Sequence, residues 1–346
     1  MFRIGILGCG KMGRIYARFF SQNEHAKVTA FYNRTTSKAQ EIAAVYDADV
    51  FDDWKKLVSD PDIDMIGICT PSHEHHAQLR ECIAHGKHVL VEKPLAATAA
   101  EAEEMAAAAL SSDLKVLVGF QMRFHPVIEK VNELLKNAGD IYSVDFYFGM
   151  YRPEVNWRHK REQGGGVLKE LGSHLIDLSC MWLGAPSYVS STDRTLGAGR
   201  EVEDFSQTII EFKHGALASI SCNYWDRNGR AIHGRIIAEN MQINFRFSSY
   251  EIADSEVMLY DEAGAHEIAI AIPDEDTIAE AYPGHLDSFK KEIDYFVEAA
   301  RGDTDISASI IEGLQSMQIT AAAYRSQRER LFIDLGQYNN NALGGG

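Results

Sequence analysis

The sequence has no excess of basic residues and no long hydrophobic run. Its 346 residues include 34 Lys and Arg against 50 Asp and Glu, which gives a formal net charge of −16 at pH 7. A nucleic-acid backbone or an anionic membrane surface attracts clustered positive charge, so neither is expected as a partner. No apolar run reaches the ~18 residues that a membrane-spanning helix needs. We therefore expect a soluble protein in which any phosphate ligand is held by a local site.

The sequence also has few cysteines and no CxxC pair. Disulfide frameworks use a dense, even set of cysteines, and structural zinc sites use closely spaced pairs. A buried strand expected at residues 2–7 leaves no room for a secretory signal in front of the fold. These features predict a cytoplasmic protein without disulfides or structural zinc. The five cysteines are Cys9, Cys69, Cys82, Cys180 and Cys222.

Length and hydrophobic periodicity predict two domains. Over residues 1–122, short apolar runs alternate with helical stretches, which is the pattern of a parallel sheet covered on both faces. An Ala-rich helix within this region has Thr98 as its expected N-cap. The expected strands are residues 2–7, 27–33, 65–69, 87–91 and 115–120.

From about residue 123 the pattern changes to long β-type runs joined by short turns, as in a largely antiparallel sheet. This second domain is expected to span residues 123–336, and the polar tail at 337–346 is expected to be disordered. The expected elements are a helix at 126–136, strands beginning at residues 142, 205, 216, 232 and 241, helices at about 286–300 and 307–328, and a short strand at 331–335.

A glycine motif follows the first expected strand. Residues 8–13 read GCGKMG, which is GxGxxG between a strand and a helix, the context that dinucleotide binding requires. In that interpretation Gly8 permits the tight turn, Gly10 lets a pyrophosphate approach the backbone, and Gly13 lets helix and strand pack closely. Lys11 and Met12 complete the loop. A glycine turn without a ligand is the alternative.

The residues after the second strand favour NADP over NAD. An NAD site uses an acidic residue about 20 positions after the glycines to bind the ribose hydroxyls, and that position holds the neutral Asn33. Arg34, Thr35 and Lys38 follow, and they offer a guanidinium, a hydroxyl and an ammonium to a 2′-phosphate. Alternatively, Arg34 and Lys38 form only the exposed start of the next helix, and NAD or dual cofactor use stays open.

Polar residues also stand at the carboxyl ends of the strands at 65–69 and 87–91, where doubly wound sheets bind ligands. The Lys93–Pro94 peptide bond is expected to be cis, because a cis bond before proline costs only about 0.5–1 kcal/mol. The residues expected to contact a cofactor here are Thr70, Pro71, His75, Glu92 and Lys93.

A glycine-rich segment in the second domain carries an acid and an imidazole. Residues 164–177 read GGGVLKELGSHLID. If a helix begins after the glycines, Glu170 and His174 lie four residues apart on one face. A carboxylate beside a histidine orients the ring and raises its basicity, which suits acid–base chemistry near neutral pH. Taken by itself, such a pair is structural about as often as catalytic.

The combination of these motifs resembles the Gfo/Idh/MocA family of oxidoreductases. GCGKMG, TPSHEHH, EKP, the GGG…E…H segment and the change of strand pattern carry the resemblance, which spans residues 2 to about 335. It implies a Rossmann domain with a doubly wound parallel sheet, followed by an α/β domain with a large, mostly antiparallel open sheet. It also implies NAD(P)-dependent action on sugars, cyclitols or related polyols, and no metal at the histidines of TPSHEHH.

The resemblance implies roles for particular residues. The lysine of the EKP motif matches Lys93, and the histidine of the glycine-rich segment matches His174. Four residues before that histidine the family usually has Asp, where this chain has Glu170. Further positions that resemble residues near the nicotinamide or the substrate are Arg123, Trp157, Arg158, Tyr282 and His285.

The resulting hypothesis is hydride transfer between a nicotinamide and a carbinol or carbonyl carbon, with Lys93 holding the reacting oxygen and His174 exchanging the proton. One alternative is a glycosidase of the same family that uses NAD in a transient redox step. Another is a non-catalytic cofactor-binding sensor or corepressor, although such a protein has no need of the Lys93 and His174 pair. The sequence fixes neither the sugar nor the reaction direction.

A homodimer or homotetramer is expected through the sheet of the second domain. Helices cover one face of that sheet, and the other face is expected to expose Tyr147, Tyr224 and Trp225, which a monomer would leave in water.

Overall fold

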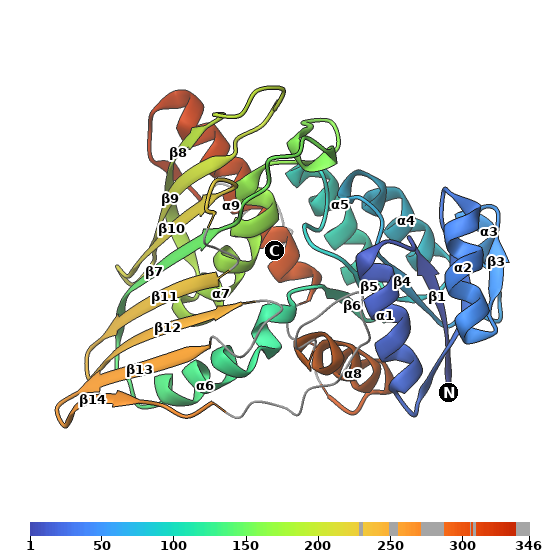
Figure 1. The fold of residues 1–346 in the computed structure, drawn as a ribbon, viewed down its shortest axis with the longest axis horizontal. Coiled ribbons are helices and arrows are strands. Elements are labelled where there is room, and N and C mark those ends of the chain that lie inside the picture. The colour runs from blue at the N-terminus through green and yellow to red at the C-terminus, as the bar shows by residue number, and fades with distance from the viewer. Residues whose placement is uncertain (228–230, 249–254, 271–286, 305, 307–308, 337–346) are drawn as a thin grey trace. The chain divides into compact units, whose positions relative to one another are not determined.

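The computed structural model describes residues 1–227, 231–248, 255–270, 287–304, 306 and 309–336 (Figure 1). The tail that was expected to be disordered, 337–346, lies outside these residues. No helix within them is long and apolar enough to cross a membrane. The chain divides into two compact units, which are Met1–Phe120 with Phe289–Met317, and Gln121–Ser288 with Gln318–Gly346.

The first unit contains a six-stranded sheet in the order β3-β2-β1-β4-β5-β6, with every pair parallel. This is the doubly wound order, in which the strand order reverses beside β1 and leaves a crevice at the carboxyl ends of the strands. The predicted parallel sheet is confirmed. The strands are β1 (Phe2–Leu7), β2 (Ala26–Tyr32), β3 (Asp49–Phe51), β4 (Met65–Ile68), β5 (His88–Val91) and β6 (Val116–Val118).

The Ala-rich helix of this unit begins where the sequence indicates. Before α5, Thr98 Oγ1 accepts from the Glu101 N–H at 3.2 Å and the Glu101 carboxylate accepts from the Thr98 N–H at 2.9 Å, which forms a capping box. The helices are α1 (Lys11–Gln22), α2 (Thr36–Tyr46), α3 (Trp54–Ser59), α4 (Ser72–Ala84) and α5 (Ala99–Leu110).

A late helix, α8 (Asp287–Arg301), packs with the first unit although it follows the second unit's sheet in the chain. Its Phe296 ring lies edge-on to Phe20 of α1 at 6.4 Å between centroids. Asn23 Nδ2 donates to Asp294 at 2.7 Å. From the sequence, this helix was assigned to the second domain, because nothing in its local pattern shows that the chain returns to the first unit here.

The second unit contains a nine-stranded sheet in the order β14-β13-β12-β11-β7-β10-β9-β8-β15. Its pairs are antiparallel except β10 with β7, which is parallel. The mostly antiparallel sheet is therefore confirmed. The strands are β7 (Ile141–Gly149), β8 (Pro186–Arg194), β9 (Phe205–Phe212), β10 (Leu217–Asn223), β11 (Ala231–Ala238), β12 (Gln242–Ser248), β13 (Glu256–Asp261), β14 (Gly264–Glu267) and β15 (Ile333–Asp334).

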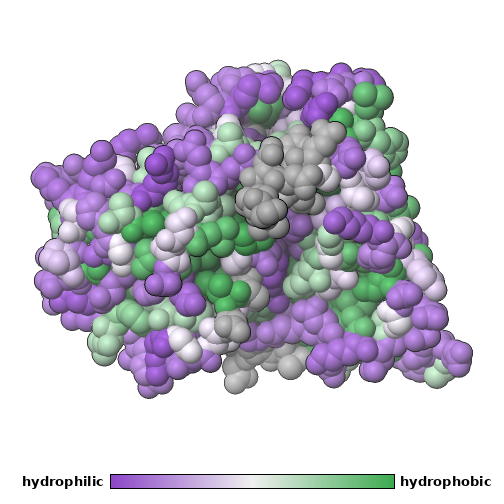
Figure 2. All heavy atoms as spheres, turned by 180° about the vertical axis from the view of Figure 1, so that it is seen from behind, coloured by the Kyte–Doolittle hydropathy of each residue, from purple (hydrophilic) through white to green (hydrophobic). Residues whose placement is uncertain are grey.

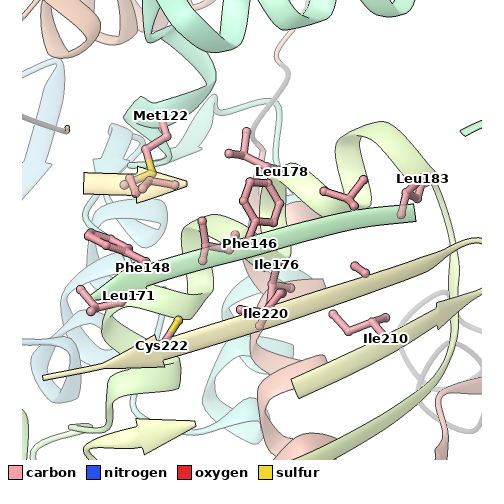
Figure 3. Close-up of a cluster of buried hydrophobic side chains, with 14 of the residues drawn as sticks. Met122, Phe146, Phe148, Leu171, Ile176, Leu178, Leu183, Ile210, Ile220 and Cys222 are labelled. Carbon is pink, nitrogen blue, oxygen red and sulfur yellow. The ribbon is translucent and has the colours of Figure 1, made fainter. Parts of the chain in front are cut away.

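One face of this sheet packs against α6 (Pro126–Leu135), α7 (Ser173–Leu183) and the later part of α9 (Ile310–Glu329). Figure 3 shows Phe146 of β7 between the sheet and Leu178 of α7. Alternate residues of each strand point to this core because side chains alternate across a sheet. This packing fixes the position of α7, the helix that carries His174.

One expectation about the other face of the sheet is wrong. Tyr224 is fully buried, and its ring lies edge-on to His159 at 5.3 Å. The reason is parity, because Tyr224 follows the buried Cys222 by two positions and so points to the same face. Tyr147 is half-buried with its hydroxyl donating to Asp226 at 2.8 Å, and Trp225 is 38% exposed.

Candidate functional site

The three motif glycines of the first unit have different surroundings. Gly8 has a φ of +97°, and a Cβ on it would lie 2.8 Å from the backbone carbon and oxygen of Cys69. A Cβ on Gly13 would lie 1.9 Å from the carbonyl oxygen of Gly8. A Cβ on Gly10 would meet nothing within 4 Å. Close packing within the chain therefore requires glycine at Gly8 and Gly13, while Gly10 borders open space.

That open space lies at the N-terminus of α1. Gly10 is the N-cap, and it has no side chain that could cap this helix end. The first N–H groups of a helix have no intrahelical partner and carry partial positive charge, so they bind phosphate groups well. Lys11 and Met12 are the first two residues of the helix and are half-buried. The residues present fit the pyrophosphate of a dinucleotide.

Gly13 is expected to tolerate alanine much less well than Gly10. The Gly13→Ala change must push the helix away from Gly8, which should lower the free energy of unfolding by about 1–3 kcal/mol. Gly10→Ala, in open space, should unfold at nearly the same denaturant concentration as the unmodified protein but bind the dinucleotide more weakly. Equal stability of the two variants would contradict this interpretation of the loop.

Asn33 connects this loop to the end of β2. Its Oδ1 accepts from the N–H of Cys9 at 3.0 Å, and its Nδ2 donates to the carbonyl oxygen of Thr35 at 3.0 Å. An amide is the side chain that can do both. Arg34, Thr35 and Lys38 are exposed beside it, and Thr35 is the N-cap of α2.

His75 holds the loops after β4 and β5 together. Its Nε2 lies 2.8 Å from the carbonyl oxygen of Thr70, and its Nδ1 lies 3.2 Å from those of Pro94 and Leu95. Burial lowers the pKa of His75, against the effect of these three oxygens. The ring predicted to contact a cofactor therefore has both nitrogens against backbone carbonyls.

The Lys93–Pro94 peptide bond is cis, as predicted, and Lys93 is half-buried. Glu92 is buried, with 8% of its surface exposed. Burial raises the pKa of Tyr16 well above its usual value, and the carboxylates of Glu92 and Glu292 add to that effect. Glu92 thus belongs to a buried polar group beneath the loop, and Lys93 is the more accessible residue of the motif.

The glycine-rich segment of the second unit packs against a preceding turn. The N–H of Gly166 donates to the carbonyl oxygen of Arg158 at 2.9 Å, and a Cβ on Gly165 would lie 2.2 Å from the same oxygen. Gly164 and Gly166 have φ angles of +77° and +131°. The three glycines are therefore required by close approach and by backbone conformation.

The helix after the glycines differs from the prediction. Residues Leu168–Gly172 form a π-helical turn, and the α-helix begins only at Ser173. Glu170 therefore lies in the π-turn and His174 in the first turn of α7. Such π-turns are rare and occur often at functional sites. The sequence pattern could not distinguish this turn from an α-helix, since both place apolar residues at similar intervals.

Glu170 and His174 are both buried, with residue exposures of 5% and 4%. The Arg158 Nε donates to Glu170 Oε2 at 2.8 Å. The ion pair keeps the carboxylate in place and makes Arg158 a neighbour of the acid rather than an isolated surface charge.

Arg123 forms a buried, two-bond ion pair that the sequence did not indicate. Its Nε donates to Asp177 Oδ2 at 2.8 Å and its Nη2 to Oδ1 at 2.6 Å, with side-chain exposures of 10% and 2%. Asp177 lies three residues after His174 on α7, and that spacing was the only available signal. The structure joins Arg123 to the helix that carries His174.

Three predicted substrate contacts are not placed. Trp157 begins a short 3₁₀ turn, Trp157–His159, but its side chain lies outside what the structure describes. Tyr282 and His285 also lie outside the described residues.

Both units match known families along most of their length. Residues 2–120 match a model described as "Oxidoreductase family, NAD-binding Rossmann fold". Residues 132–335 match one described as "Oxidoreductase family, C-terminal alpha/beta domain".

Several characterised proteins are similar in sequence or fold. The chain is 29% identical over 227 residues to the scyllo-inositol 2-dehydrogenase (NADP(+)) IolW of Bacillus subtilis (strain 168), covering 63% of this chain and 61% of that protein. It is 25% identical over 350 residues to the inositol 2-dehydrogenase of Rhizobium meliloti (strain 1021), covering 96% and 99%. Levoglucosan dehydrogenase in complex with NADH has the same fold, with a TM-score of 0.85 at 22% identity over 96% of this chain and 98% of that one.

Proposed function

The chain belongs to the Gfo/Idh/MocA family of oxidoreductases, and from that premise we propose that it transfers a hydride between a nicotinamide cofactor and a carbinol or carbonyl carbon of a sugar, sugar derivative or cyclitol. The glycine loop carries the proposal, since Gly10 borders open space at the N-terminus of α1. The substrate class is supported by two relatives named for action on inositols.

In the proposed reaction a bound nicotinamide ring supplies the hydride donor or acceptor. The Lys93 ammonium holds the reacting oxygen and stabilises the negative charge that develops on it. His174 accepts the hydroxyl proton during oxidation and returns it during reduction. Glu170 supports this chemistry from a fixed position, because the Arg158 Nε donates to its Oε2 at 2.8 Å.

We assign Arg123 and Asp177 a supporting role. Their two-bond pair ties the 3₁₀ turn Gln121–Phe124 to α7. Arg123 therefore acts through the position of α7. Direct contact with substrate is proposed for Lys93, Trp157, Arg158, His174 and Tyr282.

The deciding experiment is a screen of sugars, sugar lactones and cyclitols with NAD(H) and NADP(H), followed by nicotinamide absorbance. Stoichiometric change of absorbance with one substrate class is the expected result. Product release without net cofactor change would instead identify a glycosidase with a transient redox step. Cofactor binding without any turnover would identify a sensor.

We also propose that the protein forms a homodimer or homotetramer through the face of the nine-stranded sheet opposite α6 and α7. Ile209 and Leu217, at neighbouring strands of this sheet, are 42% and 45% exposed. Figure 2 shows the molecule from behind, where hydrophobic residues form groups among hydrophilic ones. Light scattering at working concentration should give a multiple of the monomer mass, and a monomer mass would refute the proposal.

A further inference from the structure

A buried glutamate, Glu203, caps the start of the helical segment that carries Glu170 and His174. Its Oε1 accepts from the N–H of Leu168 at 3.1 Å, and its backbone oxygen accepts from the N–H of Val167 at 3.1 Å. Glu203 comes just before β9 and is 35 residues away from Leu168 in the sequence. It satisfies two N–H groups that a helix start leaves without partners.

Tyr324 of α9 holds the same carboxylate from another side. Its hydroxyl donates to Glu203 Oε1 at 2.7 Å. A Cβ on Gly166 would lie 2.5 Å from that oxygen and 2.6 Å from the Tyr324 hydroxyl, so only glycine leaves room for the contact. Three distant stretches of the second unit therefore meet at one carboxylate.

The surroundings of Glu203 favour a change of protonation near neutral pH. Burial raises its pKa to about 7, and the nearby carboxylate of Asp193 adds to that rise. The hydrogen bonds from Tyr324 and from the Leu168 N–H act in the opposite direction. The other titratable groups near it are Cys222 of β10 and Tyr224 just after it, and the Glu203 charge adds to the rise of the pKa of both. Lys169 of the π-turn has its Nζ 5.9 Å from the Tyr324 ring centroid.

We propose that Glu203, held by Tyr324, is a positioning residue that keeps the π-turn Leu168–Gly172 in place, and that its protonation loosens this turn. The carboxylate accepts both hydrogen bonds with full charge at a helix start, where negative charge is favoured. The protonated acid accepts them more weakly. The effect on turnover rests on the proposed function, whereas the effect on the π-turn does not.

The first test is amide hydrogen exchange of peptides covering residues 166–174 between pH 5.5 and 8.5, corrected for the intrinsic pH dependence of exchange. Protection in the unmodified protein should rise with a midpoint near pH 7. Glu203→Gln has the shape of the protonated acid, so it should give low protection at every pH. Glu211→Gln is the matched control, since Glu211 lies on β9 opposite Leu217, away from the π-turn.

Two further variants keep the test decisive if Glu203→Gln does not fold. Tyr324→Phe removes the hydrogen bond that favours the Glu203 carboxylate, so the midpoint of the rise in protection should move to higher pH. Asp193→Asn removes a neighbouring negative charge, so it should move the midpoint to lower pH. A merely structural role for Glu203 predicts no such opposite shifts. Protection that is independent of pH in the unmodified protein, or midpoints that move in one direction in both variants, would overturn the proposal.

Turnover provides the second readout. With a substrate found in the screen, Glu203→Gln should lower kcat about 10- to 100-fold, because small displacements of reacting groups have effects of that size. The Kd of the cofactor should stay unchanged. If kcat is unaffected while exchange behaves as described, the positioning role is wrong. If no substrate turns over, the proposed function fails, and the exchange result still decides whether Glu203 holds the π-turn.

Discussion

Replacing His174 by alanine is expected to abolish measurable turnover, with a loss in kcat of about 10²–10⁴-fold, while the Kd of the cofactor stays nearly unchanged. The imidazole is proposed to exchange a proton with the substrate. Binding of the phosphates is assigned to the N–H groups at the start of α1 and not to this side chain. Steady-state kinetics and a fluorescence titration of the reduced cofactor separate the two effects.

Lys93→Ala is expected to abolish turnover as well, because a positive charge beside a developing alkoxide is worth about 10²–10³-fold in rate. Lys56→Ala and His85→Ala are suitable controls, since both residues are in ion pairs on the surface of the first unit. Both controls should keep the activity of the unmodified protein. Full activity of Lys93→Ala or His174→Ala would rule out the proposed chemistry.

The first unit was predictable because its elements follow from local patterns. Five of its six strands are short apolar runs that the sequence shows, and α5 has its own start signal, the capping box at Thr98. The three-residue strand β3 (Asp49–Phe51) was not predicted. The return of α8 to this unit was not predictable, because the contact of Phe296 with Phe20 depends on the tertiary fold.

In the second unit, the sequence analysis missed β8 for a physical reason. Its residues include Ser191 and Asp193, which are typical of a loop when met in sequence. In the fold both are buried, and the Asp193 carboxylate accepts from the hydroxyls of Ser191 at 2.8 Å and Ser206 at 2.7 Å. A polar strand can lie in a core when its neighbours supply the hydrogen bonds, and only the fold identifies those neighbours.

The residues of the candidate site also fall into two groups, which are those that a sequence motif shows and those that only the fold brings together. The glycine loop, Glu170 and His174 were visible in sequence as motifs, although Glu170 lies in the π-turn and His174 in α7. The Arg123–Asp177 pair and the Glu203–Tyr324 contact join residues 54 and 121 positions apart. A single sequence does not show which residues so far apart form a pair.

The second large effect is expected in the relative affinity for NADP(H) and NAD(H). We expect NADP(H) to bind more tightly than NAD(H), because Asn33 replaces the acidic residue that an NAD site uses and because Arg34 is exposed directly after it. One relative, IolW, is named for NADP(+), whereas levoglucosan dehydrogenase was solved with NADH.

Arg34→Ala should weaken NADP binding by about 10- to 150-fold and NAD binding little. A guanidinium can donate two hydrogen bonds to a phosphate, and each bond to a charged group contributes about 1.5–3 kcal/mol, or roughly 10- to 150-fold in Kd. The expected change in the Kd of NADP therefore corresponds to the loss of one such bond. Arg80→Ala is the matched control, because Arg80 is an exposed arginine of the same unit that pairs with Glu104 at 3.1 Å.

Asn33→Asp should shift the preference toward NAD. An aspartate at this position can still accept from the Cys9 N–H, as Asn33 does at 3.0 Å, so the glycine loop keeps its anchor. It adds a negative charge that repels a 2′-phosphate and can accept from the ribose hydroxyls of NAD. It loses the donor to the Thr35 carbonyl, which should cost about 0.5–1.5 kcal/mol of stability. Calorimetric titration of both cofactors measures the preference directly, and equal Kd values for NADP and NAD in the unmodified protein would overturn the assignment to Arg34.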